Sequence, residues 1–506
     1  MPDYYLGIDS GTQSTKALVV AADTGAVAGR SAIPYDLIPG LPSGHCEQHP
    51  QTWVEAMVGT VRAAIRNAGI DPAAVRGIGV SGQQHGFVPL DREGRPIRPA
   101  KLWCDTSTAA QCDLIMEAVG GPQECFRLLG NLVLPGFTAS KILWLKQNEP
   151  DHFRRLHTVL LPHDFLNFWL TGEQVMEWGD ASGTALMDVR QRRWSAEILQ
   201  TIDADLDGKL PPLRDSALPC GRLTPAAAQT LGLQPGVLVS AGGGDNMMAA
   251  IGTGNVSPGV VTASLGTSGT IFACSDRPVV DERGEIAAFC DSTGQWLPLL
   301  CTMNVTIATE LTKDLFGVDT VGLNNLATKI KPGCDGLLLL PYFSGERCPN
   351  VPDGTGVWFG ANRTTHTPAH FCRAAMEGAV LGMNYGLRRM RELGINPKEI
   401  RLTGGGSNSP LWRQIVADAF AAPVVCTTEP EGAALGAAAQ ACWAVRREQD
   451  AAARIEDVTD RWVRLDPTTR CEPVPEATAV YARMQALQDD LSGRLRETFH
   501  LRSRGI

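Results

Sequence analysis

Gly7-Ile8-Asp9-Ser10-Gly11-Thr12-Gln13-Ser14-Thr15-Lys16 is the stretch that decides the fold of this 506-residue chain. An apolar run over residues 4–8 predicts a buried strand that ends at Asp9, and a Gly/Thr/Ser turn leads into a second strand. Such a turn sets hydroxyl and backbone donors for phosphate oxygens beside a carboxylate, which can hold Mg²⁺ through water. The GxxxxGK[ST] spacing of a P-loop is absent. A plain hairpin is the alternative interpretation of the stretch.

A similar hairpin occurs near the middle of the chain. Residues 259–265 are apolar and β-branched, Gly266-Thr267-Ser268-Gly269 form a turn, and residues 270–274 return. We interpret this weak internal repeat as two domains of one design, although chance similarity would also explain it. Strands and helices alternate elsewhere, so the class is α/β.

The length also favours two large domains. We expect an N-terminal domain over 1–252 and a C-terminal domain over 253–506. The C-terminal helix, with an apolar stripe from Val480 to Leu495, is a candidate to pack back on the first domain.

Composition excludes several functional classes. The net charge is -9 and no Lys/Arg run is present, so we expect no nucleic acid partner. The 14 cysteines are scattered without a CxxC pair, which is typical of a reducing compartment and indicates no zinc site. No apolar run approaches the roughly 18 residues of a membrane helix, and the N-terminus does not resemble a signal peptide. We expect a cytoplasmic enzyme without a membrane partner, either monomer or homodimer.

Three further stretches carry polar groups next to glycines or strand ends. Asp245 follows an apolar strand and three glycines, where α/β sheets place reacting groups, although an Asx turn would look the same. Gly404-Gly405-Gly406-Ser407-Asn408 leads from a strand into a helix, which suits an adenine and its phosphates or a simple structural turn. Gln83-Gln84-His85-Gly86 and Trp103-Cys104-Asp105 offer polar and stacking groups for a polyol, but a buried structural histidine is the alternative. The small residues of 431–439 are explained by close helix packing alone.

Taken together in order, these stretches resemble the FGGY family of carbohydrate kinases over nearly the whole chain. Within the family, the resemblance is greatest to the branch that phosphorylates D-xylulose on its primary 5-hydroxyl. The resemblance rests on GIDSGTQSTK, HCEQHPQTW, SGQQHG, GNLVLPGFTASKILWLKQNEP, LLPHDFLNFWLTGE, GGGDN, SLGTSG, PYFSGERCPN and LTGGGSNSPLWRQ. It implies two actin-like, ribonuclease H-like domains with an active-site cleft between them, and ATP and Mg²⁺ as cofactors.

The resemblance also implies roles for individual residues. Asp245 matches the catalytic base and Asp9 the metal-linked acid. The remaining matches are substrate contacts at Gln84, His85 and Asn246, phosphate turns at Thr12, Gly266 and Thr267, and a nucleotide loop at Gly405, Gly406 and Asn408. From residue chemistry we add Trp103 and Asp105 to the expected sugar pocket.

Three departures leave the sugar open. Gln84 stands where Met is usual in this branch, Cys104 where Asn is frequent, and Ser107 where Arg is frequent. Ribulose, another ketose or a polyol such as glycerol therefore remain alternative acceptors. A catalytically inactive actin-like protein that binds sugar and ATP is the alternative from a different class.

Overall fold

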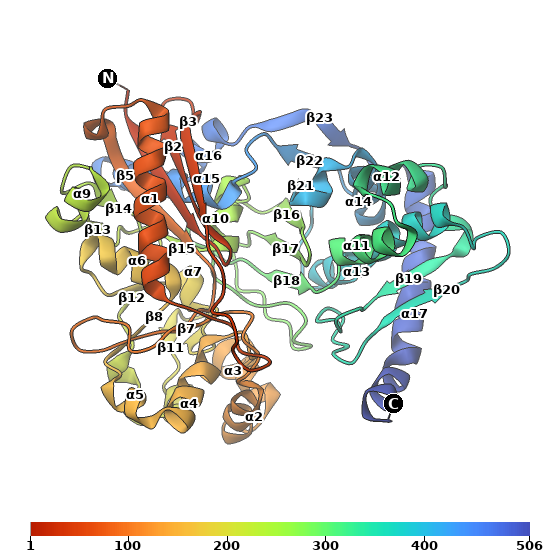
Figure 1. Cartoon of the computed structure of the whole chain (residues 1–506), viewed down its shortest axis with the longest axis horizontal. Helices are drawn as coiled ribbons and strands as arrows, with labels where there is room; N and C mark the ends of the chain where they lie inside the picture. Colours follow the sequence, from red (N-terminus) through yellow and green to blue (C-terminus); the bar gives the residue numbers. More distant parts are fainter. Residues whose placement is uncertain (1, 506) are drawn as a thin grey trace.

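The computed structural model describes residues 2–505 as two lobes, each built on one mixed β sheet (Figure 1). The first sheet contains β1 (Tyr4–Ser10), β2 (Ser14–Ala21), β3 (Val27–Pro34), β5 (Val75–Gly82), β13 (Gly221–Arg222), β14 (Leu238–Val239) and β15 (Gly243–Gly244). The second contains β16 (Val260–Leu265), β17 (Gly269–Ala273), β18 (Leu299–Thr302), β21 (Glu399–Thr403), β22 (Val424–Thr427) and β23 (Leu465–Cys471).

The two sheets share one topology. β1, β2 and β3 form an antiparallel meander, as do β16, β17 and β18. β5 and β14 then add parallel to β1, and β21 and β22 add parallel to β16 in the same way. The edge strands β13 and β23 are both antiparallel to their neighbours. The predicted α/β class and the repeat between the two halves are confirmed by this order.

Alternation along the first strands divides the core between the two faces of the first sheet. Leu6 and Val19 pack with α1 (Pro50–Ala68), whose buried side includes Trp53 and Met57. α6 (Pro162–Thr171) and α9 (Pro225–Leu231) continue this layer. Tyr5, Leu18 and Val20 point to the opposite face and pack with α15 (Gly432–Gln449). The period of two along β1 and β2 thus fixes which helices cover which face.

α10 (Asp245–Gly252) and α15 cross where the two lobes meet, and small residues permit the contact. A Cβ on Gly436 would overlap the carbonyl oxygen of Met248, and one on Gly252 would overlap the carbonyl oxygen of Gly432. On its other side α15 touches β1, where a Cβ on Gly7 would overlap the carbonyl oxygen of Ala434. Close packing therefore accounts for this small-residue helix, as the sequence predicts.

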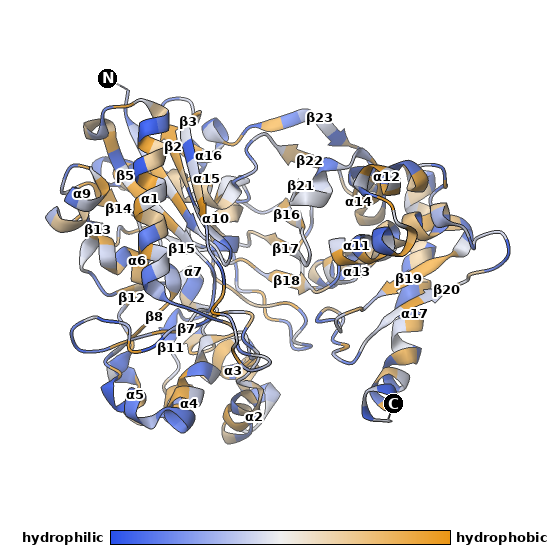
Figure 2. Cartoon of the chain, viewed as in Figure 1, coloured by the Kyte–Doolittle hydropathy of each residue, from blue (hydrophilic) through white to orange (hydrophobic). Residues whose placement is uncertain are grey.

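An appendage of helices extends the first lobe below its sheet (Figure 1). It comprises α2 (Ala109–Ala118), α3 (Pro122–Leu129), α4 (Thr138–Asn148), α5 (Pro150–Arg155) and α8 (Ala196–Ile202). Short strands join it to the sheet: β4 (Glu47–Gln48), β6 (Val88–Leu90), β7 (Ala100–Lys101), β8 (Thr158–Leu160), β9 (Met176–Glu177), β10 (Met187–Asp188), β11 (Arg193–Trp194) and β12 (Leu213–Arg214), with α7 (Trp178–Ala181). Figure 2 shows hydrophilic colour over α5, which buries no residue.

Helices cover the second sheet as well. They are α11 (Thr306–Phe316), α12 (Thr320–Ala327), α13 (Pro368–Glu392), α14 (Pro410–Phe420) and α17 (Pro475–Gly505), and the hairpin of β19 (Leu338–Pro341) and β20 (Gly356–Phe359) packs on α13. α17 packs against α13, α14 and β19. The expectation that the last helix returns to the first domain is therefore wrong.

Two segments of the second half lie on the first lobe instead. α15 and α16 (Glu456–Trp462) share a core with β1 and β2. The loop between β17 and β18 packs on the appendage, where Asn131 exchanges two hydrogen bonds with the backbone of Ala288, at 2.7 and 2.8 Å. Arg192 lies between the rings of Trp178 and Trp296. Within residues 2–505, no helix is long and apolar enough to cross a membrane.

Candidate active site

Asp245 is the first residue of α10, directly after β15. β15 pairs in parallel with the end of β5, so the start of α10 lies beside the loop that carries Gln84. A Cβ on Gly244 would meet the Gln84 side chain at 2.6 Å, so glycine is what allows this approach. The Asn246 amide joins the two elements by donating to Gln84 Oε1 at 2.8 Å and to Asp245 Oδ1 at 3.0 Å.

The surroundings of Asp245 shift its pKa toward neutral pH, where the carboxylate can accept a proton. Burial is the main cause that raises the pKa of Asp245, the carboxylates of Asp9 and Asp180 add to the rise, and the resulting value is about 7. Hydrogen bonds from Asn246 offset part of this shift. A carboxyl group with a pKa in this range is a much better proton acceptor than an ordinary aspartate.

Asp9 lies near the end of β1 and accepts a hydrogen bond from Ser81 Oγ at 2.7 Å. Burial raises its pKa, while Ser81 and Lys16 lower it. The Lys16 ammonium itself is paired with Glu431 at 2.6 Å. The Asp9 carboxylate raises the pKa of Asp245. Such a pair of carboxylates forms a hard oxygen environment that a divalent cation would stabilise, so the site fits Mg²⁺ with Asp9 as the holding residue.

Gln84 and His85 present polar atoms that the protein does not satisfy. Gln84 Nε2 and His85 Nδ1 are buried without a hydrogen-bond partner in residues 2–505. His85 has φ of 63°, a strained value for a non-glycine residue, and its ring lies 4.7 Å from the Phe137 ring centroid and 5.7 Å from that of Phe289. Burial lowers the pKa of His85 to about 3, with the Lys141 charge adding to the shift. The imidazole is therefore neutral at physiological pH and able to accept a hydrogen bond from a hydroxyl.

Thr12 and Trp103 are joined to each other. Trp103 Nε1 donates to Thr12 Oγ1 at 2.9 Å, and that hydroxyl donates to Gln83 Oε1 at 3.1 Å. The Thr12 hydroxyl is thus held inside the protein, which couples the turn after β1 to the tryptophan expected at the sugar pocket.

Asp105 does not face a ligand, which corrects its expected role as a substrate contact. It is completely buried, and its oxygens accept from Lys101 Nζ at 3.0 Å, from the Cys46 backbone at 2.9 Å and from the Ser107 hydroxyl at 2.6 Å. Burial raises the pKa of Asp105, but these hydrogen bonds and the Lys101 charge have the larger effect. The net result is a lowered pKa, so the carboxylate stays ionised. Asp105 positions the loop after Trp103 rather than contacting sugar.

The same region contains three side chains with metal-ligand chemistry, His45, Glu47 and Asp105. Lys101 Nζ lies among them, at 3.2 Å from His45 Nδ1, 3.1 Å from Glu47 Oε1 and 3.0 Å from Asp105 Oδ2. The ammonium group supplies the positive charge that the cluster requires, so we do not interpret it as a metal site.

The second lobe brings together the remaining predicted residues. Gly266 and Thr267 form the turn between β16 and β17, and a short 3₁₀ turn, Gly405–Asn408, follows β21. Leu265 connects the two turns, because a Cβ on Gly406 would meet its side chain at 2.8 Å. Gly406 is buried for this packing reason, whereas Gly405 and Asn408 are exposed and available to a ligand. No hydrogen bond within residues 2–505 links these turns to Asp245.

Sequence reasoning missed a buried ionic cluster beneath Asp245. His163 Nδ1 lies 2.7 Å from Asp180 Oδ2, and His163 Nε2 lies 3.0 Å from Asp164 Oδ1, all fully or almost fully buried. Burial raises the pKa of nearby Glu177 to about 7. His163 and Asp164 stand in LLPHDF and Asp180 closes Trp178-Gly179-Asp180, but neither stretch signals that these side chains meet.

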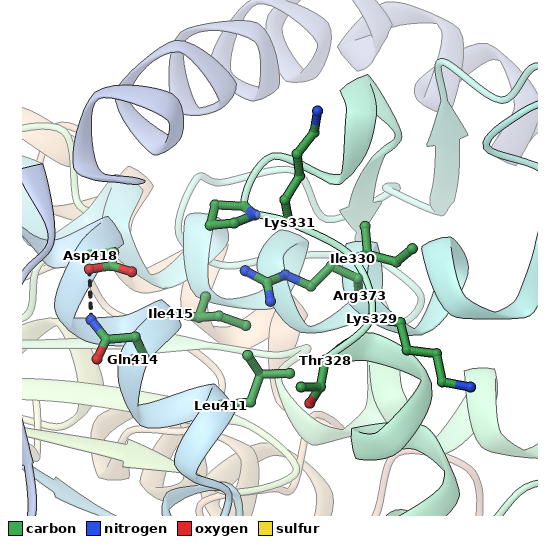
Figure 3. Close-up of a pocket in the computed structure, with 10 residues that line it drawn as sticks. Thr328, Lys329, Ile330, Lys331, Arg373, Leu411, Gln414, Ile415 and Asp418 are labelled. Atoms are coloured by element: carbon green, nitrogen blue, oxygen red, sulfur yellow. Dashed lines mark hydrogen bonds between the residues drawn. The ribbon is translucent and has the colours of Figure 1, made fainter. Parts of the chain in front are cut away.

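A cavity of about 400 Å³ opens elsewhere on the second lobe, between α13, α14 and the segment after α12 (Figure 3). Arg373, Gln414 and Asp418 line it, and the Gln414 amide donates to the Asp418 carboxylate at 2.9 Å. None of the predicted site residues lines this cavity, so it is separate from the candidate active site.

Comparisons with known proteins agree over both lobes. Residues 4–252 match the N-terminal domain of the FGGY family of carbohydrate kinases, and residues 261–445 match its C-terminal domain. A xylulose kinase of Haemophilus influenzae is 41% identical over 93% of this chain and 95% of its own length. A xylulose kinase of Streptomyces coelicolor is 37% identical over 90% of each chain. The crystal structure of xylulose kinase from Rhodospirillum rubrum superposes with a TM-score of 0.89 at 26% identity, covering 98% of this chain and 100% of that one. This chain belongs to the FGGY family of carbohydrate kinases.

Proposed function

We propose that the protein transfers the γ-phosphoryl group of ATP to the primary 5-hydroxyl of D-xylulose. One observation carries the proposal: Asp245, with its pKa near neutrality, is joined through Asn246 to Gln84, and the neighbouring Gln84 Nε2 and His85 Nδ1 are buried without a hydrogen-bond partner in residues 2–505. Xylulose kinases at 37–41% identity over most of the chain support this acceptor. Ribulose, another ketose or glycerol are the alternatives to be tested.

In this proposal Asp245 accepts a hydrogen bond from the attacking hydroxyl and takes its proton as the phosphorus–oxygen bond forms. General-base help of this kind is worth roughly 10²–10⁴-fold, and much of it comes from orientation. Asp9 would hold Mg²⁺, which supplies neutralisation of the phosphate charge. Thr12 would bind phosphate oxygens through the backbone of its turn, because its hydroxyl already donates to Gln83. Thr267 would bind them through its backbone and hydroxyl, and Gly405, Gly406 and Asn408 would border the nucleotide.

Neutral His85, Gln84, Asn246 and the Trp103 face would bind the sugar. The residues that hold sugar belong to the first domain, 1–252, and those for nucleotide mainly to the second, 253–506. Because the reaction consumes ATP, a cytoplasmic location suits it. The protein would act as a monomer or a homodimer. Closure of the lobes over the sugar would exclude water from the γ-phosphate.

An ADP-release assay across D-xylulose, D-ribulose, L-ribulose and glycerol tests the acceptor. We expect the highest kcat/KM with D-xylulose. The Asp245→Asn variant should bind ATP and sugar with near wild-type affinity but turn over roughly 10²–10⁴-fold more slowly. A different preferred acceptor would replace D-xylulose in the proposal. Near-normal turnover by the variant would contradict the role of Asp245. If none of the acceptors supports turnover, the catalytically inactive binding protein is favoured.

A further inference from the structure

Arg347 is an unpaired cation on the second lobe. It lies in Gly345-Glu346-Arg347-Cys348-Pro349, on the loop between β19 and β20. Figure 1 shows this loop extending from the hairpin toward the centre of the molecule. Arg347 is exposed although its two neighbours are buried, and its guanidinium forms no ion pair within residues 2–505.

The backbone on both sides of Arg347 is fixed. The Glu346 carboxylate accepts from the Met303 backbone at 2.7 Å and from Asn304 Nδ2 at 3.1 Å, and Asn304 Nδ2 also donates to the Gly345 carbonyl at 2.7 Å. Cys348 is completely buried. The loop is therefore anchored to the end of β18, and the Arg347 side chain is exposed between two buried neighbours. An anchored loop with one free cation resembles a ligand-binding element more than a solvated surface turn.

The anchor directs Arg347 toward the sugar end of the site. Cys301 of β18 packs at the margin of the apolar cluster that contains Phe137 and Phe289, the two rings against His85. The Arg347 charge affects the pKa of both Cys301 and His85. Burial raises the pKa of Cys301 and the Arg347 charge opposes the rise, whereas burial lowers the pKa of His85 and Arg347 adds to the fall. The charged groups that dominate at Asp245 are Asp9 and Asp180 instead.

We propose that Arg347 is a specificity-determining residue that binds the acceptor sugar from the second lobe, opposite His85. A guanidinium carries five donors and no acceptor, and it engages two adjacent oxygens at once. Neutral His85 provides the complementary acceptor. A ketose that lies between them presents vicinal oxygens to Arg347 and a hydroxyl to His85, at the end of the sugar remote from Asp245. Because the two partners come from different lobes, sugar binding also favours lobe closure.

This inference rests on the proposed function, so wild-type kinetics are measured first with the acceptor panel, and the best acceptor is used thereafter. Arg347→Ala should raise KM for that sugar roughly 10–100-fold, with KM for ATP changed less than threefold. Arg347→Lys keeps the charge without the paired donors, so its KM for the sugar should lie between those of wild type and Arg347→Ala. Arg363→Ala is the matched control, since Arg363 is also exposed on the second lobe and forms no ion pair in residues 2–505. It should behave like wild type.

Each departure from these results has a defined meaning. An unchanged sugar KM in Arg347→Ala overturns the inference, as does a rise in the KM for ATP alone, which would place the guanidinium at the phosphates. Circular dichroism melting of each variant excludes unfolding as the cause. Absence of turnover by the wild-type enzyme with every acceptor contradicts the proposed function rather than the role of Arg347. For that case, sugar binding to wild type and Arg347→Ala is compared by Trp fluorescence, and equal affinities overturn the inference.

Discussion

The groups around Asp245 raise its pKa, so keeping the carboxylate ionised at neutral pH lowers the stability of the folded protein. Its pKa is about 7 in the folded chain against 3.8 for the ordinary group. A folded-state pKa above the unfolded value means that folding favours the protonated acid. Stability from this group is complete below pH 3.8 and is lost as the pH rises toward 7.

Asp245→Asn should therefore be more stable than wild type, by an amount that grows with pH. We expect the difference in free energy of unfolding to increase by about 3 kcal/mol between pH 4.5 and 7.5. Urea denaturation of the ligand-free proteins at both pH values measures it. A difference that is the same at both pH values would show that the Asp245 carboxyl is not perturbed by its surroundings.

The sequence predicts residue types at this site better than their contacts. Asp245 and Gln84 were predicted to share one site because both follow strand ends beside glycines, and the structure joins them through Asn246. The contacts of Asp105 could not be predicted, because its hydrogen bonds come from Lys101 of strand β7 and from the backbone of Cys46, 59 residues away. Arg347 had no signature in the sequence either, because an exposed arginine in a loop looks the same whether or not it binds a ligand.

The crossing of α10 and α15 is the element-scale feature on which the site depends, because α10 begins at Asp245. The small residues of 431–439 in α15 were enough to predict a closely packed helix from composition alone. The partner of a helix was less predictable: the apolar stripe of α17 shows that one side is buried, but not which lobe buries it. Tertiary contacts between distant segments decide that choice.

Gly436→Ala should lower the free energy of unfolding by about 1–3 kcal/mol or more and reduce turnover, because its Cβ would overlap the Met248 carbonyl oxygen. Gly493→Ala provides the control with the opposite sign. Gly493 lies in α17 with no atom within 4 Å of an added Cβ, so alanine should stabilise the protein by roughly 0.5–1 kcal/mol. Thermal and urea unfolding compare the two. Equal stability of Gly436→Ala and wild type would mean that α10 and α15 do not cross so closely.

At the scale of the whole molecule, two sheets of one topology contribute different halves of the proposed reaction. In that proposal the first lobe supplies the base, the metal-linked acid and the polar atoms for sugar, and the second supplies glycine turns and an arginine without an ion pair in residues 2–505. α15 and the loop between β17 and β18 belong to the second half of the chain yet pack on the first lobe. These segments join the lobes, so the lobe closure in the proposed function would occur around them.

The position of the phosphate on the product tests the account most directly. Purified protein is incubated with Mg²⁺, ATP and D-xylulose, and the product is examined by ³¹P–¹H correlation NMR. We predict one phosphomonoester whose phosphorus couples to the C5 methylene protons, formed in equal amount to ADP and lost in Asp245→Asn. Phosphate on any other carbon, or only inorganic phosphate released with ADP, would contradict a primary 5-hydroxyl directed at Asp245.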